Sequence, residues 1–366
     1  MALLVAVAFL CVPPGRAQTL YKVGVTHRAF LKDDASYDWR GSKVHALTTT
    51  LWYPADSHVT ETPQWVGDPA NAFASAGSAA ADAALAPAPA KFPLILLSHG
   101  TGGSALMMAW LGTQLAGHGF IAVAVNHPGN NAVDGYTVQG FTLGWERAVD
   151  LSKVLDGMLA DPEFGPRIDP HRVGAAGFSY GGYTVLELAG GIGDLSVAAT
   201  ECDVPHPTAA ICTSPPEMPD LMPRAIQLYH ADPAYRRALD ASRQSYHDPR
   251  IRAVFAIAPL AMVFSPQSLE KIRIPVEIVA GAGDPILSPQ ANAAFAASHI
   301  PNAKLTIYPG GVGHYTFLDT CTPMGQTTRP GLCVDHPGVD RNAIHAETAR
   351  KAAAFFTENL TLINNP

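Results

Sequence analysis

The chain has 366 residues, 48% of them hydrophobic, so it is long enough to bury one large core or two smaller ones. A formal net charge of -7, with no run of Lys or Arg, argues against binding to nucleic acid or to an anionic membrane surface. Only 15% of the residues are charged whereas Gly (32) and Pro (31) are abundant, a composition typical of a compact domain with many turns.

The N-terminal sequence resembles a secretory signal peptide. An apolar run over residues 2–12 is followed by two prolines and a small-residue site ending at Ala17, after which we expect cleavage. The apolar run is too short for a permanent membrane span, and no basic residue precedes it. Cys11 would suit a lipid anchor, but the bulky Leu10 before it argues against one. We therefore expect one mature domain over residues 18–366 and a periplasmic or secreted location.

Four cysteines follow the signal, and an even number in an exported chain indicates disulfides. Four cysteines allow three pairings. The short separations favour Cys202 with Cys212 and Cys321 with Cys333. Free or metal-binding thiols are the alternative, although the sequence contains no CxxC pair.

The first elements of the mature chain are predicted as antiparallel strands at one edge of a sheet. Residues 23–31 and 43–54 carry β-branched and aromatic side chains in partial alternation. Residues 65–91 are rich in Ala, Pro and Gly without a clear period. They predict a surface loop or a weak helix rather than a domain boundary.

From residue 92 onward, short apolar strands alternate with helices. Strands are predicted at 93–100, 120–129, 173–179, 252–259, 275–284 and 304–310. Helices are predicted at 104–119, 144–160, 180–190 and 288–300. Strands that are apolar throughout are typical of a sheet buried on both faces by crossover helices. The sequence therefore predicts an α/β fold with one mostly parallel central sheet and helices on both of its faces.

Residues 192–250 interrupt this alternation. The segment is rich in Pro, Met and Cys, and it contains a predicted helix at 233–246. Such an insertion is either a lid that shapes a substrate pocket or a plain surface excursion, and the sequence favours neither.

The sequence Gly177-Phe178-Ser179-Tyr180-Gly181 follows a predicted buried strand and precedes a predicted helix. A serine at so sharp a turn needs a strained backbone, with no side chain two positions before it and two positions after it. Gly177 and Gly181 meet that need. The same context surrounds the nucleophile of α/β-hydrolases, so we predict that Ser179 is a catalytic nucleophile.

A serine nucleophile also requires amide donors for the oxyanion that forms on the substrate. The Tyr180 amide lies at the predicted helix N-terminus, where the helix dipole favours negative charge. We assign the second donor to Thr101, in a glycine-rich loop that follows the strand 93–100. His99 in this loop is interpreted as a structural histidine rather than a proton-transfer group.

In α/β-hydrolases the acid and the histidine follow the serine in that order. Asp284 ends a predicted strand and is predicted to orient the base, and His314 follows the next strand in a glycine-rich loop and is predicted to be the base. His345 falls in a predicted C-terminal helix, and His336 has no strand before it. Asp319 follows His314 and so breaks the order. The sequence contains neither HExxH nor GxGxxG, nor a phosphate loop with its Lys, so we expect no metal and no cofactor.

These motifs resemble a known family. SHGTGG, GFSYGG, GAGD and GVGH, in this order, are similar to segments of the bacterial α/β-hydrolases grouped with platelet-activating-factor acetylhydrolase and labelled dienelactone-hydrolase-like. TTTLWYPA and DPRIRAVFAIAP extend the likeness to most of residues 21–320. The resemblance implies the α/β-hydrolase fold and hydrolysis of short or oxidised acyl esters without calcium. Dienelactone hydrolases proper use a cysteine nucleophile, so Ser179 argues against that activity. Two features depart from the family: the insertion at 192–250 and the cysteine-closed loop after His314.

The sequence as a whole predicts a serine-dependent carboxylic ester hydrolase that acts through an acyl-enzyme. Its expected substrates are small-molecule or lipid-like esters with short or modified acyl groups. A peptidase or amidase with the same three residues is an alternative, because the triad does not choose the leaving group. A non-catalytic binding protein on a hydrolase scaffold is a further alternative, which the presence of all three residues disfavours.

Overall fold

The computed structural model describes residues 20–31, 40–44, 46–204 and 212–361. The predicted signal peptide at residues 1–17, with Cys11, lies outside these residues. None of the helices in the described ranges is both long and apolar enough to cross a membrane.

A single ten-stranded sheet organises the described part of the chain, in the order β12-β11-β10-β9-β5-β6-β2-β1-β4-β3. Its strands are β1 (Lys22–Leu31), β2 (Ala46–Ala55), β3 (Thr62–Val66), β4 (Ala74–Ala81), β5 (Phe92–Ser98), β6 (Ile121–Val125), β9 (Ile168–Phe178), β10 (Ile251–Ile257), β11 (Val276–Gly281) and β12 (Lys304–Tyr308). From β6 through β5 and β9 to β12 all neighbours run parallel, whereas β2 pairs antiparallel with both β6 and β1. The mostly parallel sheet and its antiparallel N-terminal strands are thus confirmed. A separate ribbon pairs β7 (Asn130–Asn131) with β8 (Gly135–Tyr136).

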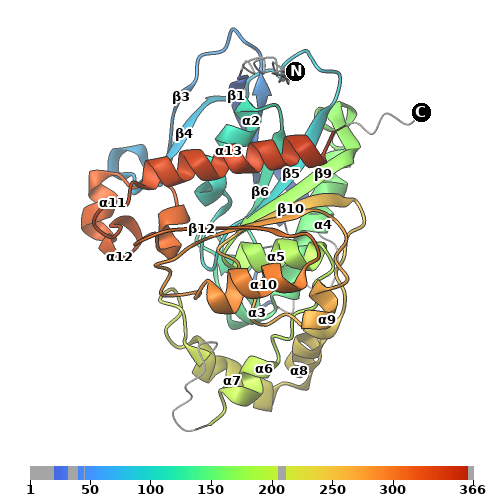
Figure 1. Cartoon of the computed structure of the whole chain (residues 1–366), viewed down its shortest axis with the longest axis vertical. Helices are drawn as coiled ribbons and strands as arrows, with labels where there is room; N and C mark the ends of the chain where they lie inside the picture. The colour runs from blue at the N-terminus through green and yellow to red at the C-terminus, as the bar shows by residue number, and fades with distance from the viewer. Residues whose placement is uncertain (1–19, 32–39, 45, 205–211, 362–366) are drawn as a thin grey trace, which may run out of the picture.

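Helices cover both faces of the sheet. The described helices are α2 (Ala109–Gly117), α3 (Val138–Thr142), α4 (Trp145–Ala160), α5 (Tyr180–Leu188), α6 (Val197–Glu201), α7 (Leu221–Ala231), α8 (Pro233–Asp240), α9 (Pro266–Leu269), α10 (Phe295–His299), α11 (Pro323–Thr328), α12 (Pro330–Cys333) and α13 (Arg341–Asn359). Side chains alternate between the faces of a strand, so β5 contributes Leu94 and Leu96 to one core and Ile95 and Leu97 to the other. The first core lies beneath α4 and α5, and the second beneath α2 and α13. Figure 1 shows α13 crossing the sheet, with α6, α7 and α8 gathered at the lower end of the molecule.

The prediction for residues 65–91 was wrong. This region contains the end of β3, a short 3-10 turn at Pro69–Asn71 and the strand β4, which pairs with β1 and β3. Alanine is a poor strand former, so the sequence pattern hides β4. Small residues are nevertheless needed there, because a Cβ added to Gly77 would lie 3.1 Å from Oγ1 of Thr113 in α2.

The insertion at 192–250 has a small core of its own. Met218, Leu221 and Tyr235 are buried against Val138 and Phe141 of α3. The helix predicted at 233–246 is present as α8, followed by a 3-10 turn at Ala241–Arg243. The insertion is therefore packed onto the main domain through a defined hydrophobic contact.

Both predicted disulfides are confirmed. Cys202 pairs with Cys212 inside the insertion, and Cys321 pairs with Cys333 in the segment between β12 and α13. Each bond closes a short loop, and the loop between Cys321 and Cys333 contributes Arg329 and Leu332 to the cavity described below.

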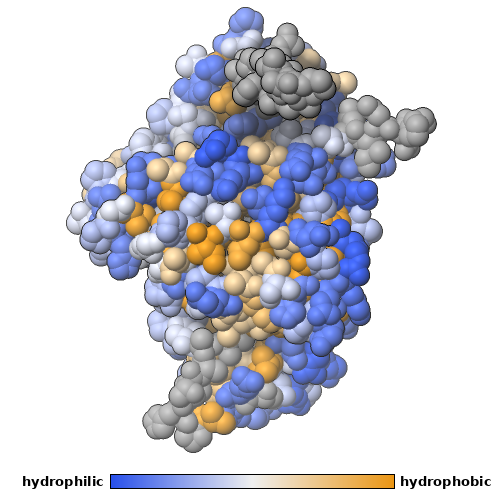
Figure 2. Space-filling view, viewed as in Figure 1, coloured by the Kyte–Doolittle hydropathy of each residue, from blue (hydrophilic) through white to orange (hydrophobic). Residues whose placement is uncertain are grey.

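The edge strand β12 exposes apolar side chains. Leu305 is 38% exposed and Ile307 is 37% exposed. Figure 2 shows hydrophobic residues gathered on this face where Figure 1 places β12 and α10. The rest of the visible face is mostly hydrophilic.

Candidate active site

Ser179 occupies a strained turn between β9 and α5. Its φ is 57° and its ψ is -115°, a conformation that costs free energy for a residue with a side chain. A Cβ on Gly177 would lie 2.1 Å from the carbonyl oxygen of Gly181, and one on Gly181 would lie 1.9 Å from that of Ser98. Both glycines are therefore required by close backbone approach, as the sequence analysis expected.

Ser179, His314 and Asp284 form one hydrogen-bonded chain. The Ser179 hydroxyl lies 2.9 Å from Nε2 of His314, and Nδ1 of His314 lies 2.6 Å from Oδ2 of Asp284. A carboxylate can only accept, so Nδ1 donates to Asp284, and Nε2 is left to accept the serine proton. The three residues follow the carboxyl ends of β9, β12 and β11. All three are buried, and Ser179 retains 8% exposure.

Two backbone amides near Ser179 are free to bind an oxyanion. Tyr180 is the first residue of α5, where an amide has no intrahelical acceptor. Among the described residues, neither the Tyr180 amide nor the Thr101 amide donates a hydrogen bond to another protein group. Both amides belong to residues that line the same cavity as Ser179.

The loop that carries Thr101 passes directly over Ser179. A Cβ added to Gly100 would lie 3.0 Å from the Phe178 ring and 3.3 Å from the Cβ of Ser179, both tighter than ordinary contacts, so glycine suits this close approach. The loop is fixed from outside by Asn130, whose Oδ1 accepts a 2.8 Å hydrogen bond from the Gly102 amide. Its position is thus set by contacts on both sides.

A second Ser-His-Asp chain lies behind this loop. The Ser98 hydroxyl lies 3.0 Å from Nε2 of His127, and Nδ1 of His127 lies 2.9 Å from Oδ2 of Asp150. All three residues have 0% exposure, and none of them lines the cavity. Burial, with the cation Arg147 nearby, lowers the pKa of His127 to about 3. This second chain has the connectivity of a triad but no access to a substrate, so it is a structural element.

Arg147 of α4 links the loop to the nucleophile turn. Its guanidinium donates to the carbonyl oxygen of His99 and to the hydroxyl of Ser98, the latter at 3.2 Å. The same group lies 4.8 Å from the centre of the Tyr180 ring. Burial lowers the pKa of Arg147 to about 10, which leaves the side chain cationic at neutral pH. His99 itself donates from Nδ1 to the carbonyl of Gly100 at 2.7 Å, consistent with the bracing role predicted for it.

The other candidate residues lie away from the hydrogen-bonded chain of Ser179, His314 and Asp284. His345 stacks on Trp110, with ring centres 4.4 Å apart, and its Nε2 donates to the carbonyl of Thr316 at 2.8 Å. Asp319 is buried and accepts from the Trp110 amide at 3.2 Å, and His336 is exposed. None of these three candidates, His336, His345 and Asp319, lines the cavity that contains Ser179.

The cavity at Ser179 has a volume of about 1010 Å³ and is also lined by His314. The insertion supplies part of its wall, including Pro215, Glu217, Met222 and Tyr235. The cysteine-closed loop after His314 supplies Arg329 and Leu332. The insertion therefore shapes the cavity and is more than a plain surface excursion.

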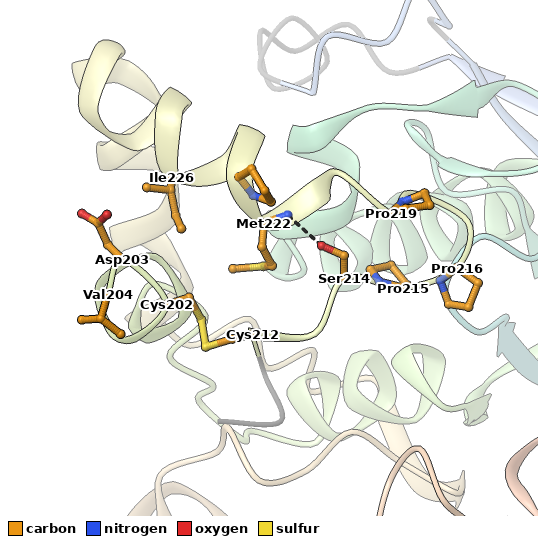
Figure 3. Close-up of a pocket in the computed structure, with 11 residues that line it drawn as sticks. Cys202, Asp203, Val204, Cys212, Ser214, Pro215, Pro216, Pro219, Met222 and Ile226 are labelled. Carbon is orange, nitrogen blue, oxygen red and sulfur yellow. Dashed lines mark hydrogen bonds between the residues drawn. A yellow bond between two sulfur atoms is a disulfide. The ribbon is translucent and has the colours of Figure 1, made fainter. Parts of the chain in front are cut away.

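A second, more open cavity of about 760 Å³ lies beside the disulfide Cys202–Cys212 (Figure 3). It shares Ser214, Pro215, Pro216 and Met222 with the first cavity. The segment from Ser214 to Met222 is consequently a thin wall between the two cavities.

Two residues near the site, Arg147 and Glu217, could not be identified from the sequence motifs. Arg147 lies on the same helical stripe as Leu151, Val154 and Met158, so a charged residue among apolar ones was the available signal. Glu217 lies in an irregular Pro-rich segment, where no periodicity marks which side chains face inward. Its place in the cavity follows only from the packing of the insertion.

Comparisons with known proteins agree with this architecture. The solved structure of a ferulic acid esterase from Streptomyces cinnamoneus superposes with a TM-score of 0.62 and covers 97% of this chain and 95% of its own. The two sequences are 24% identical, so the likeness supports the fold alone. Among curated proteins, Lipase 1 of Moraxella sp. (strain TA144) is 39% identical over 80 residues, which are 22% of either chain. Cutinase est1 of Thermobifida alba is 35% identical over 106 residues, 28% of this chain and 32% of the cutinase.

The matched segments thus span about a fifth to a third of these curated relatives. A family model for platelet-activating factor acetylhydrolase, isoform II, matches residues 37–147, as the resemblance in the motifs had suggested. The model of the alpha/beta hydrolase family matches residues 94–323, which include Ser179 and His314. Together with the sheet order, that match shows that the chain belongs to the alpha/beta hydrolase family.

Proposed function

We propose that the protein is a serine-dependent carboxylic ester hydrolase that acts through an acyl-enzyme. The observation that carries this proposal is the chain Ser179–His314–Asp284, with distances of 2.9 and 2.6 Å, at the wall of a cavity of about 1010 Å³. That volume suits a small-molecule or lipid-like ester. Relatives that bear the names lipase and cutinase support the same class of reaction.

In the acylation step, Oγ of Ser179 attacks the ester carbonyl carbon and transfers its proton to Nε2 of His314. The carbonyl oxygen becomes an oxyanion, which accepts hydrogen bonds from the amides of Tyr180 and Thr101. Asp284 stabilises the imidazolium and keeps the ring oriented. His314 then protonates the leaving alkoxide, and the acyl group remains on Ser179.

In the deacylation step, a water molecule gives a proton to Nε2 of His314 and attacks the acyl carbonyl. The same two amides bind the second oxyanion. Collapse of this intermediate releases the carboxylic acid, and the proton returns from His314 to Oγ of Ser179. The strained turn holds Oγ at the cavity wall during both steps. Close backbone contacts at Gly177 and Gly181 support the turn.

A peptidase or amidase would use the same residues, so the leaving group must be tested directly. Para-nitrophenyl butyrate and butyryl para-nitroanilide carry the same acyl group and release chromogenic products. We expect kcat/KM to be far higher for the ester, and the Ser179→Ala variant to hydrolyse neither substrate above background. Equal or faster turnover of the anilide would contradict the ester assignment.

We further propose that the protein is exported to the periplasm or secreted. Two disulfides support an oxidising compartment, and the apolar N-terminal sequence supports export. Fractionation of cells that express the full chain tests this proposal, with a cytoplasmic, uncleaved product as the contrary result.

A further inference from the structure

Glu217 is a charged residue in a cavity whose wall is mainly apolar and aromatic. Of the described residues that line the cavity, Glu217 and Arg329 are those with a carboxylate, ammonium or guanidinium side chain. Glu217 lies in a turn closed by a 3.0 Å hydrogen bond from the Met218 amide to the carbonyl of Pro215. Burial raises the pKa of the Glu217 carboxyl, as expected where water has only partial access.

The turn that carries Glu217 is fixed on both sides. Met218 is buried in the small core between the insertion and α3. The hydroxyl of Ser214 accepts a 3.0 Å hydrogen bond from the Met222 amide, which ties the Pro-rich segment to the start of α7 (Figure 3). Glu217 is therefore held in place by the packing of its neighbours.

The stem of Glu217 lies against the loop that carries Thr101. A Cβ added to Gly102 would be 2.6 Å from Cγ of Glu217 and 3.3 Å from the hydroxyl of Tyr136. Tyr136 in turn donates to the Gly102 carbonyl at 2.9 Å. Glu217 thus lies across the loop next to the proposed oxyanion site.

The carboxyl group of Glu217 is close enough to the reacting centre to interact with charges there. Its charge adds to the effect of burial in raising the pKa of Tyr315 to about 12, and the charge of His314 opposes the rise at Glu217 itself. Tyr315 and His314 both line the cavity. Glu217 therefore contacts the loop that carries Thr101 and shares the cavity with His314.

Within the described part of the chain, no other residue donates a hydrogen bond to this carboxyl or pairs with it. Its own backbone amide is the donor that acts on it, so a half-buried carboxyl that can accept several hydrogen bonds keeps acceptor capacity that a ligand can fill. We propose that the Glu217 carboxyl binds a hydrogen-bond donor of the substrate, a hydroxyl or an ammonium group, close to the scissile ester. This inference rests on the proposed ester hydrolysis and names a feature of its substrate.

Three methyl esters with the same heavy-atom skeleton test the acyl side of the bond: methyl butyrate, methyl 3-hydroxypropanoate and methyl 3-aminopropanoate. Propyl butyrate and 2-hydroxyethyl butyrate test the alcohol side. Titration of the released acid at constant pH gives kcat/KM for each. The readout is the ratio of kcat/KM for a donor ester to that for its methyl-terminated counterpart.

We expect the wild-type protein to favour at least one donor ester over its methyl-terminated counterpart. Glu217→Leu should lower this ratio of kcat/KM values about 10- to 100-fold. Glu217→Gln keeps an acceptor oxygen but loses the charge. It therefore preserves the ratio for a hydroxyl substrate and lowers it for an ammonium substrate, which distinguishes the two donors. The matched control is Glu201→Gln, on the exposed surface of the same insertion and outside both cavities, which should leave every ratio unchanged.

Thermal denaturation first establishes that the wild type and Glu217→Leu are both folded. Equal ratios of kcat/KM in these two proteins would then overturn the inference while leaving the ester hydrolysis in place. Equal losses on all esters, with the pH profile of kcat moved to lower pH, would instead assign Glu217 to support of the His314 imidazolium and would also overturn it. Absence of hydrolysis of every ester by the wild type would contradict the proposed function and this inference together.

Discussion

Both carboxylate oxygens of Asp284 are engaged, and one of them orients His314. Oδ2 lies 2.6 Å from Nδ1 of His314, and Oδ1 accepts from the amides of Ile286 and Leu287, each at 2.8 Å. The acid is thus fixed in direction as well as in distance. An asparagine would keep its oxygen on the two amides and turn its NH2 group toward His314.

We therefore expect Asp284→Asn to lower kcat by roughly 10⁴-fold. The NH2 group would make Nδ1 an acceptor, so the ring proton would move to Nε2, which could no longer accept the proton of Ser179. Steady-state kinetics on a short-chain ester measures the loss.

Asp161→Asn is the matched control for this change. Asp161 has the same local geometry, with Oδ1 accepting from the amides of Glu163 and Phe164 at 2.9 Å, and its Oδ2 accepts from Arg28. It lies outside the cavity, so its variant should keep kcat. A loss of less than tenfold in Asp284→Asn, or an equal loss in the control, would contradict the role of Asp284.

Arg147→Lys should lower kcat by up to about 10²-fold, with a smaller change in KM. A lysine ammonium cannot reproduce the planar fork that reaches both the His99 carbonyl and the Ser98 hydroxyl, nor lie over the Tyr180 ring in the same way. The loop and the nucleophile turn would then lose their common support, and the amides would be less well placed for the oxyanion.

Arg167→Lys controls for a general loss of stability. Arg167 also lies over an aromatic ring, that of Phe92, and also donates to loop carbonyls, those of Ala86, Pro89 and Ala90, but these groups lie outside the Thr101 loop and the nucleophile turn. Thermal denaturation and kinetics of both variants should show reduced stability in each and reduced kcat only in Arg147→Lys. If Arg147→Lys melts earlier yet keeps its kcat, the arginine supports folding alone.

Much of the fold could be predicted because buried parallel strands are apolar throughout. The runs at 93–100 and 275–284 correspond to β5 and β11, with ends displaced by a few residues. The strand β4 was missed, because its alanines carry no strand signal and its identity comes from pairing with β1 and β3. Local pattern was sufficient for the apolar strands from β5 to β12 and failed for the alanine-rich β4.

The residues of the candidate site likewise fall into those with a local sequence signal and those without one. Ser179 could be predicted because its two flanking glycines are a local requirement of the turn, and Asp284 and His314 because they follow consecutive strands. Arg147 and Glu217 could not, since their positions depend on contacts between distant segments of the chain. The sequence motifs also give no sign of the buried chain Ser98–His127–Asp150, which differs from the candidate triad in its full burial and in having the histidine before the acid.

Acid should destabilise the protein partly through His345. Burial lowers the pKa of His345 to about 4, whereas an unfolded histidine has a pKa near ~6.5. Below pH ~6.5 the unfolded chain binds a proton at this histidine that the folded chain does not bind. The free energy of unfolding therefore falls as the pH drops from about 6.5 to about 4, and His345 accounts for at most roughly 3 kcal/mol of that fall.

His345→Gln retains a donor for the Thr316 carbonyl and removes the titrating group. Urea denaturation at pH 7.5 and pH 4.5 should show a smaller loss of stability on acidification in this variant than in the wild type. The exposed His58, changed to Gln, serves as the control and should leave the loss as it is. An equal loss in all three proteins would show that other groups govern acid sensitivity.

The most direct test of the account is covalent labelling by a fluorophosphonate, which reacts with a serine only when a neighbouring base activates it and the cavity admits the reagent. Intact-protein mass spectrometry of the wild type should show a single adduct that peptide mapping assigns to Ser179, and the Ser179→Ala protein should show none. A wild type that stays unlabelled, or an adduct that persists in Ser179→Ala, would contradict the claim that Ser179 is an activated nucleophile.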